Sequence, residues 1–238
     1  MNQDTVNYAG FTPRPSRSHL AWAIAIMAAV LLGAAIFGLI FGYVAKSTGG
    51  PASDLITLGT VGGAAIAGCA VLYFGFVRRC RWGWKELGFV RPTHSLWHLI
   101  WWIPATVAAG GIGAMLIGTA MGLSPNGDST ESAGLSLGIA ARVVILLGTV
   151  VLVPLIEEIA FRRVLMDWLD TRFPTRAAAV ATTVIFTVMH FSPVMMVYVI
   201  FLGTSLILAR LWFQSLWGSF LVHAANNALV TGIALLAL

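Results

Sequence analysis

Long apolar runs separated by short polar segments dominate the chain, and each run predicts a helix that crosses a membrane. A crossing helix needs about 20 mostly apolar residues. The runs cover residues 20–44, 55–77, 96–121, 137–162, 176–191, 194–209 and 216–238. The fifth and sixth runs are short, so we expect tilted or embedded helices there. The pattern therefore predicts an all-α, polytopic transmembrane helical bundle with about seven spans.

The composition supports this prediction. The chain has 238 residues, of which 58% are hydrophobic and 10% are charged, whereas a soluble domain carries about 25% charged residues. So little polar surface excludes a soluble enzyme, a disordered tail and a fibrous protein. The net charge of +5 is small and lies in particular loops, which indicates a topology signal. We therefore expect a lipid bilayer as the environment and no nucleic-acid partner.

The basic residues predict the orientation. With seven spans, Lys46 and Arg142 fall on one side of the membrane and the other twelve basic residues on the opposite side: Arg14, Arg17, Arg78, Arg79, Arg81, Lys85, Arg91, Arg162, Arg163, Arg172, Arg176 and Arg210. Loops of membrane proteins that are rich in Lys and Arg usually lie on the cytoplasmic side. We therefore expect a cytoplasmic N-terminus and an external C-terminus, in the plasma membrane if the chain is bacterial.

The organisation along the chain follows from these segments. We expect a polar cytoplasmic tail over residues 1–19 and N-terminal transmembrane helices with a basic interfacial loop over residues 20–121. Residues 122–238 form the expected C-terminal helical core. Two GxxxG spacings, Gly38 to Gly42 and Gly59 to Gly63, predict close helix crossings in the N-terminal part.

Ionisable and amide side chains within the apolar runs gather in the C-terminal half. Such groups are costly in a membrane and read as functional by default. Glu158 and Arg162 are i,i+4 neighbours, so the arginine can neutralise that carboxylate. Glu157 lies about 100° around the helix and does not share this partner. The expected site draws on three segments and comprises Glu157, Glu158, Arg162, His190, His223 and Asn227, with Asn226 adjacent.

These side chains suggest hydrolytic chemistry. Glu157 suits a general base, His190 a second ligand for water, and the i,i+4 pair His223 and Asn227 an oxyanion clamp. Taken singly, each polar residue also fits a role in helix packing. A glutamate with two histidines also suits a zinc site with an open position. The HxxxH pair His94 and His98 has no Glu between them, and we interpret it as interfacial.

Three motifs in order give a more specific indication. They are EExxxR from Glu157 to Arg162, FxxxH from Phe186 to His190, and HxxxN from His223 to Asn227. This set resembles the CAAX protease and bacteriocin-processing family, also called the Abi family, which includes type II CAAX prenyl endopeptidases. The stretch from Glu86 to Pro92 resembles the ELGF-type loop of that family. The motif-bearing resemblance covers residues 137–238 and, with this loop, reaches back to residue 78.

The resemblance implies an intramembrane glutamate endopeptidase that uses neither a metal nor another cofactor. By this resemblance Glu157 and His190 activate water, His223 and Asn227 stabilise the oxyanion, and Glu158 and Arg162 support the site, with Glu158 helping to place His190. The substrate would be a membrane-associated peptide or protein, such as a lipid-modified chain or a leader peptide. The alternative is a non-catalytic immunity or peptide-binding scaffold protein that uses the same cavity. A small transporter is disfavoured because no inverted repeat is detectable. The oligomeric state is not indicated.

Overall fold

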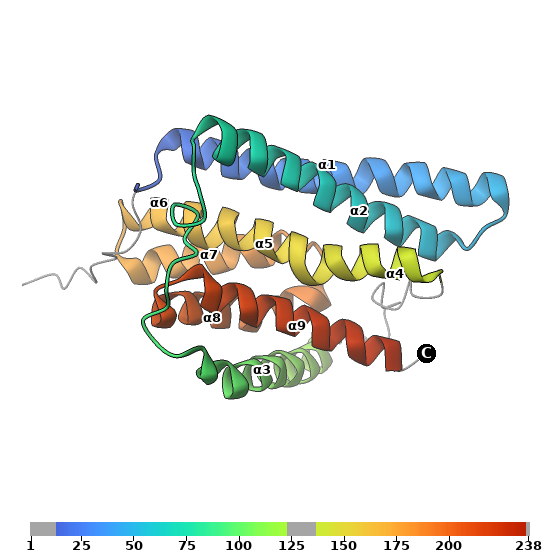
Figure 1. Ribbon diagram of the computed structural model, residues 1–238. Coiled ribbons are helices and arrows are strands. Elements are labelled where there is room, and N and C mark those ends of the chain that lie inside the picture. The colour runs from blue at the N-terminus through green and yellow to red at the C-terminus, as the bar shows by residue number, and fades with distance from the viewer. Residues whose placement is uncertain (1–12, 123–136, 237–238) are drawn as a thin grey trace, which may run out of the picture. The chain divides into compact units, whose positions relative to one another are not determined.

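The computed structural model describes residues 13–122 and 137–236, and every regular element within them is helical (Figure 1). The long α-helices are α1 (Arg17–Thr48), α2 (Ala52–Leu72), α3 (Leu99–Ala120), α7 (Thr175–Val188), α8 (Pro193–Phe213) and α9 (Leu216–Leu236). Between α3 and α7 lie α4 (Ile139–Leu146), η3 (Leu147–Leu152), α5 (Val153–Glu157), η4 (Glu158–Leu165) and α6 (Met166–Asp170). The π-helical segment η1 (Tyr73–Arg79) continues α2, and the short 3-10 helix η2 (Leu96–His98) precedes α3; residues 80–95 form the loop between them. The predicted all-α fold class is confirmed.

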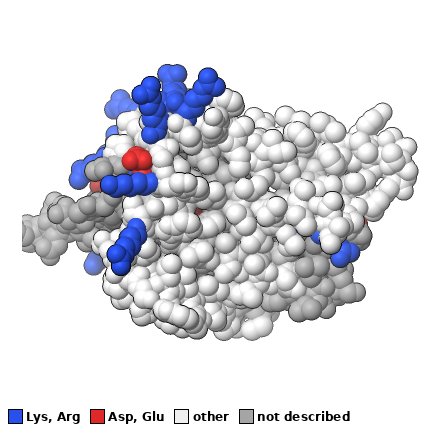
Figure 2. All heavy atoms as spheres, in the orientation of Figure 1, with Lys and Arg blue, Asp and Glu red and all other residues white. Residues whose placement is uncertain are grey.

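Five helical segments among the described residues are long and apolar enough to cross a membrane: Arg17–Thr48, Ala52–Arg79, Leu96–Ala120, Ile139–Asp170 and Pro193–Phe213. The expected fifth span corresponds to α7, which has 14 residues and is shorter than a crossing helix. The expected seventh span corresponds to α9, which has 21 residues. Most of the face drawn in Figure 2 carries no charged side chain. The chain is an integral membrane protein.

Two helix ends differ from the sequence prediction. The expected fourth span ends at Arg162, but the helical segment continues to Asp170. Arg163 and Asp167 do not end it, because they neutralise each other one turn apart at 2.9 Å. The expected sixth span ends at residue 209, but α8 includes Arg210 and runs to Phe213.

Arg163 and Arg210, which the topology prediction counts as markers of one membrane side, lie inside the protein. Arg162, Arg163 and Arg210 are fully buried, because carboxylates within the protein pair with them. The prediction of the orientation therefore rests on the basic residues that remain in loops.

The chain divides into two compact units. The described part of the first unit comprises residues 13–23, 82–122 and 158–223, and that of the second comprises residues 24–81, 137–157 and 224–236. The division falls within α1, between α5 and η4, and within α9. Each unit therefore combines segments that are far apart in the sequence.

In the second unit, α1 and α2 lie side by side (Figure 1) and cross where glycines remove side chains. A Cβ at Gly59 would meet the Phe37 carbonyl oxygen at 2.5 Å, and one at Gly63 would clash with the carbonyl of Gly33. A Cβ at Gly38 would lie 2.7 Å from Thr60 Oγ1. Both GxxxG spacings therefore mark a close crossing, as predicted.

In the first unit, α8 packs against both α3 and α7. On α3, a Cβ at Gly110 would lie 2.7 Å from the Tyr198 ring, so the glycine admits this aromatic side chain of α8. The loop before α3 is fixed to the turn between α8 and α9, because Leu216 N–H donates to Gly88 and Ser215 Oγ donates to the Val90 carbonyl. These contacts hold the elements that carry the candidate site.

Candidate active site

A buried ion pair forms the centre of the site in the first unit. Glu158 and Arg162 are both fully buried on η4, and Arg162 Nη1 lies 3.1 Å from Glu158 Oε1. The predicted pair is therefore present, although η4 is a π-helical segment rather than an ordinary α-helix. Single π-helical turns inside α-helices frequently occur at functional sites.

His223 contacts the same carboxylate from α9. Its Nδ1 lies 3.0 Å from Glu158 Oε1, and the carboxylate accepts this hydrogen bond. Glu158 Oε1 thus holds a guanidinium and an imidazole together. The resemblance implied that Glu158 helps to place His190, whereas the hydrogen bond that this carboxylate makes in the structure is to His223.

His190 is fixed by its own helix end. It follows α7, is half-buried, and its Nδ1 lies 2.9 Å from the Phe186 carbonyl oxygen. Since a carbonyl only accepts, Nδ1 carries the proton in this hydrogen bond. The lone pair of the neutral ring is then on Nε2. The next residue, Phe191, has a φ of 55°, a left-handed conformation that is strained for a bulky side chain.

The Phe186 ring connects these groups. It is fully buried, and the rings of His190 and His223 lie 5.0 and 5.9 Å from it, both edge to face. The Arg162 guanidinium carbon lies 4.1 Å from the centre of the same ring, within range of a cation–π interaction. The phenylalanine of FxxxH is therefore the packing residue around which both imidazoles and the arginine gather.

Glu157 and Asn227 belong to the second unit. Glu157 is half-buried at the end of α5, directly before Glu158 in the chain. Asn227 follows His223 by four positions on α9, and its Nδ2 donates to the Thr149 carbonyl at 2.9 Å. Their convergence with His190 and His223 stays a prediction.

Pro154 explains why Asn227 contacts Thr149. In the i→i+5 pairing of a π-helix, the Thr149 carbonyl would accept from residue 154, and proline has no N–H. The Asn227 amide satisfies this carbonyl instead. One N–H of the Asn227 amide is thereby committed to the fold, and the amide group has a second N–H.

The sequence analysis missed a second buried charge cluster in the first unit. Arg163 Nη1 lies 2.9 Å from Asp167 Oδ2, and Arg210 Nη2 of α8 lies 3.5 Å from Asp167 Oδ1. Arg163 also donates to the Glu86 carbonyl at 2.7 Å and to the Pro13 carbonyl. The ELGF-like loop is thus attached to η4. The i,i+4 spacing of Arg163 and Asp167 in an apolar run was the signal that could have revealed the cluster.

Gly203 was missed as well. A Cβ at this α8 position would lie 3.2 Å from Phe186 Cδ1 and 3.4 Å from Thr183 Cγ2. The missing side chain leaves room for the Phe186 ring. Sequence alone gives no signal for this contact, because it depends on how α8 packs on α7.

The described residues hold no group of three or more His, Cys, Asp or Glu side chains placed to bind a metal ion. The two histidines of the HxxxH pair, His94 and His98, instead contact Trp212, with ring centres 4.3 and 6.3 Å from it.

Comparisons with known proteins agree with the motifs. Residues 139–229 match the family described as "Type II CAAX prenyl endopeptidase Rce1-like". No curated protein and no solved structure matches the chain. The match covers less than half of the chain but includes all three motifs from Glu157 to Asn227. The resemblance is therefore confirmed over this segment, and residues 139–229 resemble a family of CAAX-type membrane proteases.

Proposed function

We propose that the protein is an intramembrane glutamate endopeptidase that hydrolyses peptide bonds in membrane-associated, lipid-modified or leader-peptide substrates. The observation that carries the proposal is the fixation of two imidazoles through Nδ1, His190 by the Phe186 carbonyl and His223 by the Glu158 carboxylate. Each ring therefore directs its Nε2 edge away from its anchor. Orientation of this kind is what an imidazole needs to act on water or on a developing oxyanion.

In the proposed reaction, Glu157 accepts a proton from water as the water oxygen attacks the scissile carbonyl carbon. His190 Nε2 accepts a hydrogen bond from the same water and orients it. The carbonyl oxygen becomes an oxyanion, to which His223 Nε2 and the second N–H of Asn227 donate. The C–N bond then breaks, and the proton passes from Glu157 to the leaving amine.

Glu158 and Arg162 act as positioning residues in this scheme. His223 can donate from Nε2 while donating from Nδ1 only when both nitrogens are protonated. Glu158 Oε1 accepts from His223 Nδ1 at 3.0 Å, and Arg162 Nη1, 3.1 Å from the same oxygen, holds the carboxylate in place.

The remaining parts of the proposal concern the setting. We infer that residues 122–238 carry the catalytic core, with a cytoplasmic N-terminus and an external C-terminus. The membrane excludes bulk water, so a peptide must reach the catalytic groups in a cavity shielded from lipid.

The test compares wild type with Glu157→Gln in membranes by a proteome-wide search for altered peptide termini, with and without a zinc chelator. Termini that disappear in Glu157→Gln and persist with chelator support a glutamate protease. Loss of cleavage with chelator alone supports a zinc enzyme. No difference between two folded, equally abundant proteins supports the non-catalytic immunity or scaffold alternative.

A further inference from the structure

An apolar groove runs between α3 and α8 in the first unit. It has a volume of about 740 Å³ and extends along α3 from Trp101 to Ile117. Its wall on α8 includes Ile200, Phe201 and Leu208. Both helices belong to segments long and apolar enough to cross a membrane, so the groove lies at the depth of the hydrocarbon.

The polar side chains that line the groove are used within the protein. Trp102 Nε1 donates to Ser205 Oγ at 2.9 Å, and Thr106 Oγ1 lies 2.6 Å from the same oxygen. Thr204 Oγ1 donates to the Ile200 carbonyl, and Trp101 Nε1 donates to His98 Nδ1. Because these bonds are internal, the groove presents hydrocarbon to its occupant.

The shape of the groove suits an acyl chain. Its wall on α8 runs from Ile200 to Leu208, which is about 12 Å at 1.5 Å per residue. The groove is open along one side, and the side chains that line it present carbon. A single acyl chain can therefore lie along it.

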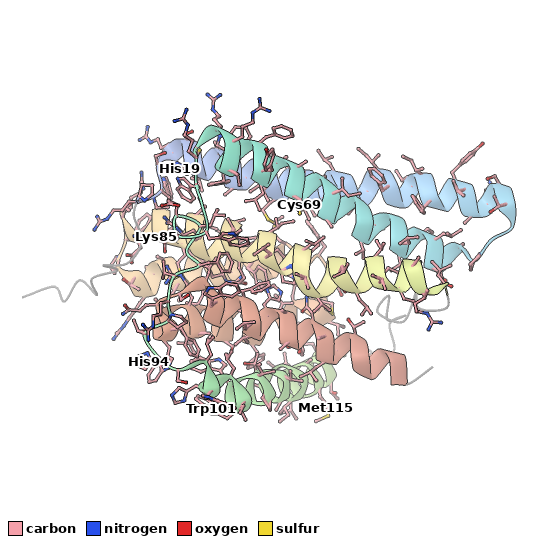
Figure 3. All side chains as sticks on the ribbon, viewed as in Figure 1. His19, Cys69, Lys85, His94, Trp101 and Met115 are labelled. Carbon is pink, nitrogen blue, oxygen red and sulfur yellow. The ribbon has the colours of Figure 1, made fainter. Side chains whose placement is uncertain are left out.

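A second hollow, which contains a basic residue, lies beside one end of the groove. It has a volume of about 650 Å³ and is lined by residues Arg91–Trp97, which include one arginine, one histidine and no acidic residue. Trp212 joins the two features, since its ring stacks on His94 at 4.3 Å and lies 6.5 Å from the Trp102 ring in the groove. Figure 3 shows His94 and Trp101 at the beginning of α3, with Met115 farther along the helix.

The hollow is held in place and carries the side chains of a membrane interface. Thr93 N–H donates to the Phe213 carbonyl at 2.9 Å, and His94 Nδ1 lies 2.8 Å from the Trp212 carbonyl oxygen. Trp97 and Trp101 are 77% and 55% exposed, and tryptophan concentrates at the level of lipid headgroups. The basic hollow and the apolar groove are neighbours through Trp212, and together they match the two ends of one lipid.

We propose that this surface binds an anionic phospholipid, with one acyl chain in the α3–α8 groove and the phosphate-bearing headgroup in the hollow beside Arg91. The cation at Arg91 and the absence of acidic lining residues give the preference for an anionic headgroup. Basic residues near an anionic lipid surface contribute about 1 kcal/mol each, which is about fivefold in affinity. The site uses none of the residues of the proposed catalytic machinery.

The test measures lipid retained by the full-length protein in detergent, using native mass spectrometry. Phosphatidylglycerol and phosphatidylcholine with identical acyl chains are the two probes. We expect phosphatidylglycerol to be retained about fivefold better, and Arg91→Gln to remove this preference. Lys85→Gln, an exposed cation of the same loop outside the hollow, should keep it. Inorganic phosphate should not displace the lipid, because it lacks the acyl chain.

The groove is tested by filling it. Ala109→Trp places a large ring in the groove, whereas Ala108→Trp changes an exposed neighbour outside its lining. Retention should fall for Ala109→Trp and persist for Ala108→Trp. Equal retention of the two lipids by wild type, or equal behaviour of Arg91→Gln and Lys85→Gln, would overturn the proposal. The comparison of Arg91→Gln with Lys85→Gln still decides the question if Ala109→Trp fails to fold.

Discussion

The Glu158 carboxylate holds the His223 imidazole, with 3.0 Å between Oε1 and Nδ1. The same oxygen lies 3.1 Å from Arg162 Nη1. A single buried atom therefore links the first motif to the third. This arrangement makes Glu158 a positioning residue whose structural and functional contributions can be separated by mutation.

Replacing one partner of this buried pair should be costly. Arg162→Ala strands the Glu158 carboxylate, and we expect a loss of about 3–5 kcal/mol of unfolding free energy. Thermal unfolding of the two proteins in detergent measures this loss of stability. The control is Arg172→Ala, because Arg172 is exposed, pairs with no carboxylate among the described residues and contacts only local groups, the Trp168 carbonyl and ring and Thr171. Unchanged stability of Arg162→Ala would contradict the structural role.

Replacing both Glu158 and Arg162 with apolar residues separates the contribution of Glu158 to stability from its contribution to the orientation of His223. Exchanging a buried ion pair for hydrophobic residues of similar size is often neutral or stabilising. We therefore expect Glu158→Leu with Arg162→Met to recover much of the stability lost by Arg162→Ala. Cleavage should not recover, because His223 has lost its anchor. Recovery of both properties would show that Glu158 has no part in orienting His223.

Gly203 provides a test of the packing around Phe186. Ala stabilises a helix interior by roughly 0.5–1 kcal/mol relative to Gly, and a Cβ at Gly118 on α3 would meet no atom within 4 Å. Gly118→Ala should therefore be neutral or stabilising. Gly203→Ala pushes against Phe186 at 3.2 Å, and we expect it to cost about 1–3 kcal/mol and to reduce turnover. Parallel melting curves and cleavage rates compare the two, and equal shifts would refute the contact.

The Thr149 carbonyl links Asn227 to Pro154. Asn227→Ala leaves this carbonyl without its donor, which should cost about 1–3 kcal/mol. In a Pro154→Ala background residue 154 regains an N–H, so the cost of Asn227→Ala should shrink. A double-mutant cycle on unfolding free energy measures this coupling, and strictly additive effects would exclude it. Turnover should stay low in both backgrounds if Asn227 also donates to the oxyanion.

Glu86 predicts a pH dependence of stability. Hydrogen bonds from the backbone N–H groups of Glu86 and Gly83 hold the pKa of this carboxylate below its usual value of 4.5. The folded state therefore binds this proton more weakly than the unfolded state. The stabilisation is present above pH 4.5 and is lost as the pH falls through the lowered folded-state pKa. Wild type should lose stability more steeply than Glu86→Gln in that acidic range, and identical profiles would contradict the assignment.

Sequence reasoning predicted the helical elements and the local pairs because both depend on short-range periodicity. Glu158 and Arg162 are one turn apart, so their ion pair followed from spacing. The contact between Glu158 and His223 joins residues 65 positions apart and depends on packing. Gly203 and the pairing of Arg210 with Asp167 escaped for the same reason. Charge was also misread, since a basic residue in the sequence carries no mark that tells a loop from a buried ion pair.

The buried Arg210 has a consequence for how the chain is assembled in the bilayer. Arginine near the end of a lone membrane helix can extend to the headgroup level, and Arg210 lies in the last turn of α8. Arg163 reaches the membrane with Asp167 on its own helical segment. Arg210 follows on α8, 43 residues after its carboxylate partner. In a lone α8 the arginine can stay at the interface, and it becomes buried only when α8 packs close enough to pair with Asp167. This ion pair should therefore form after both segments have entered the membrane.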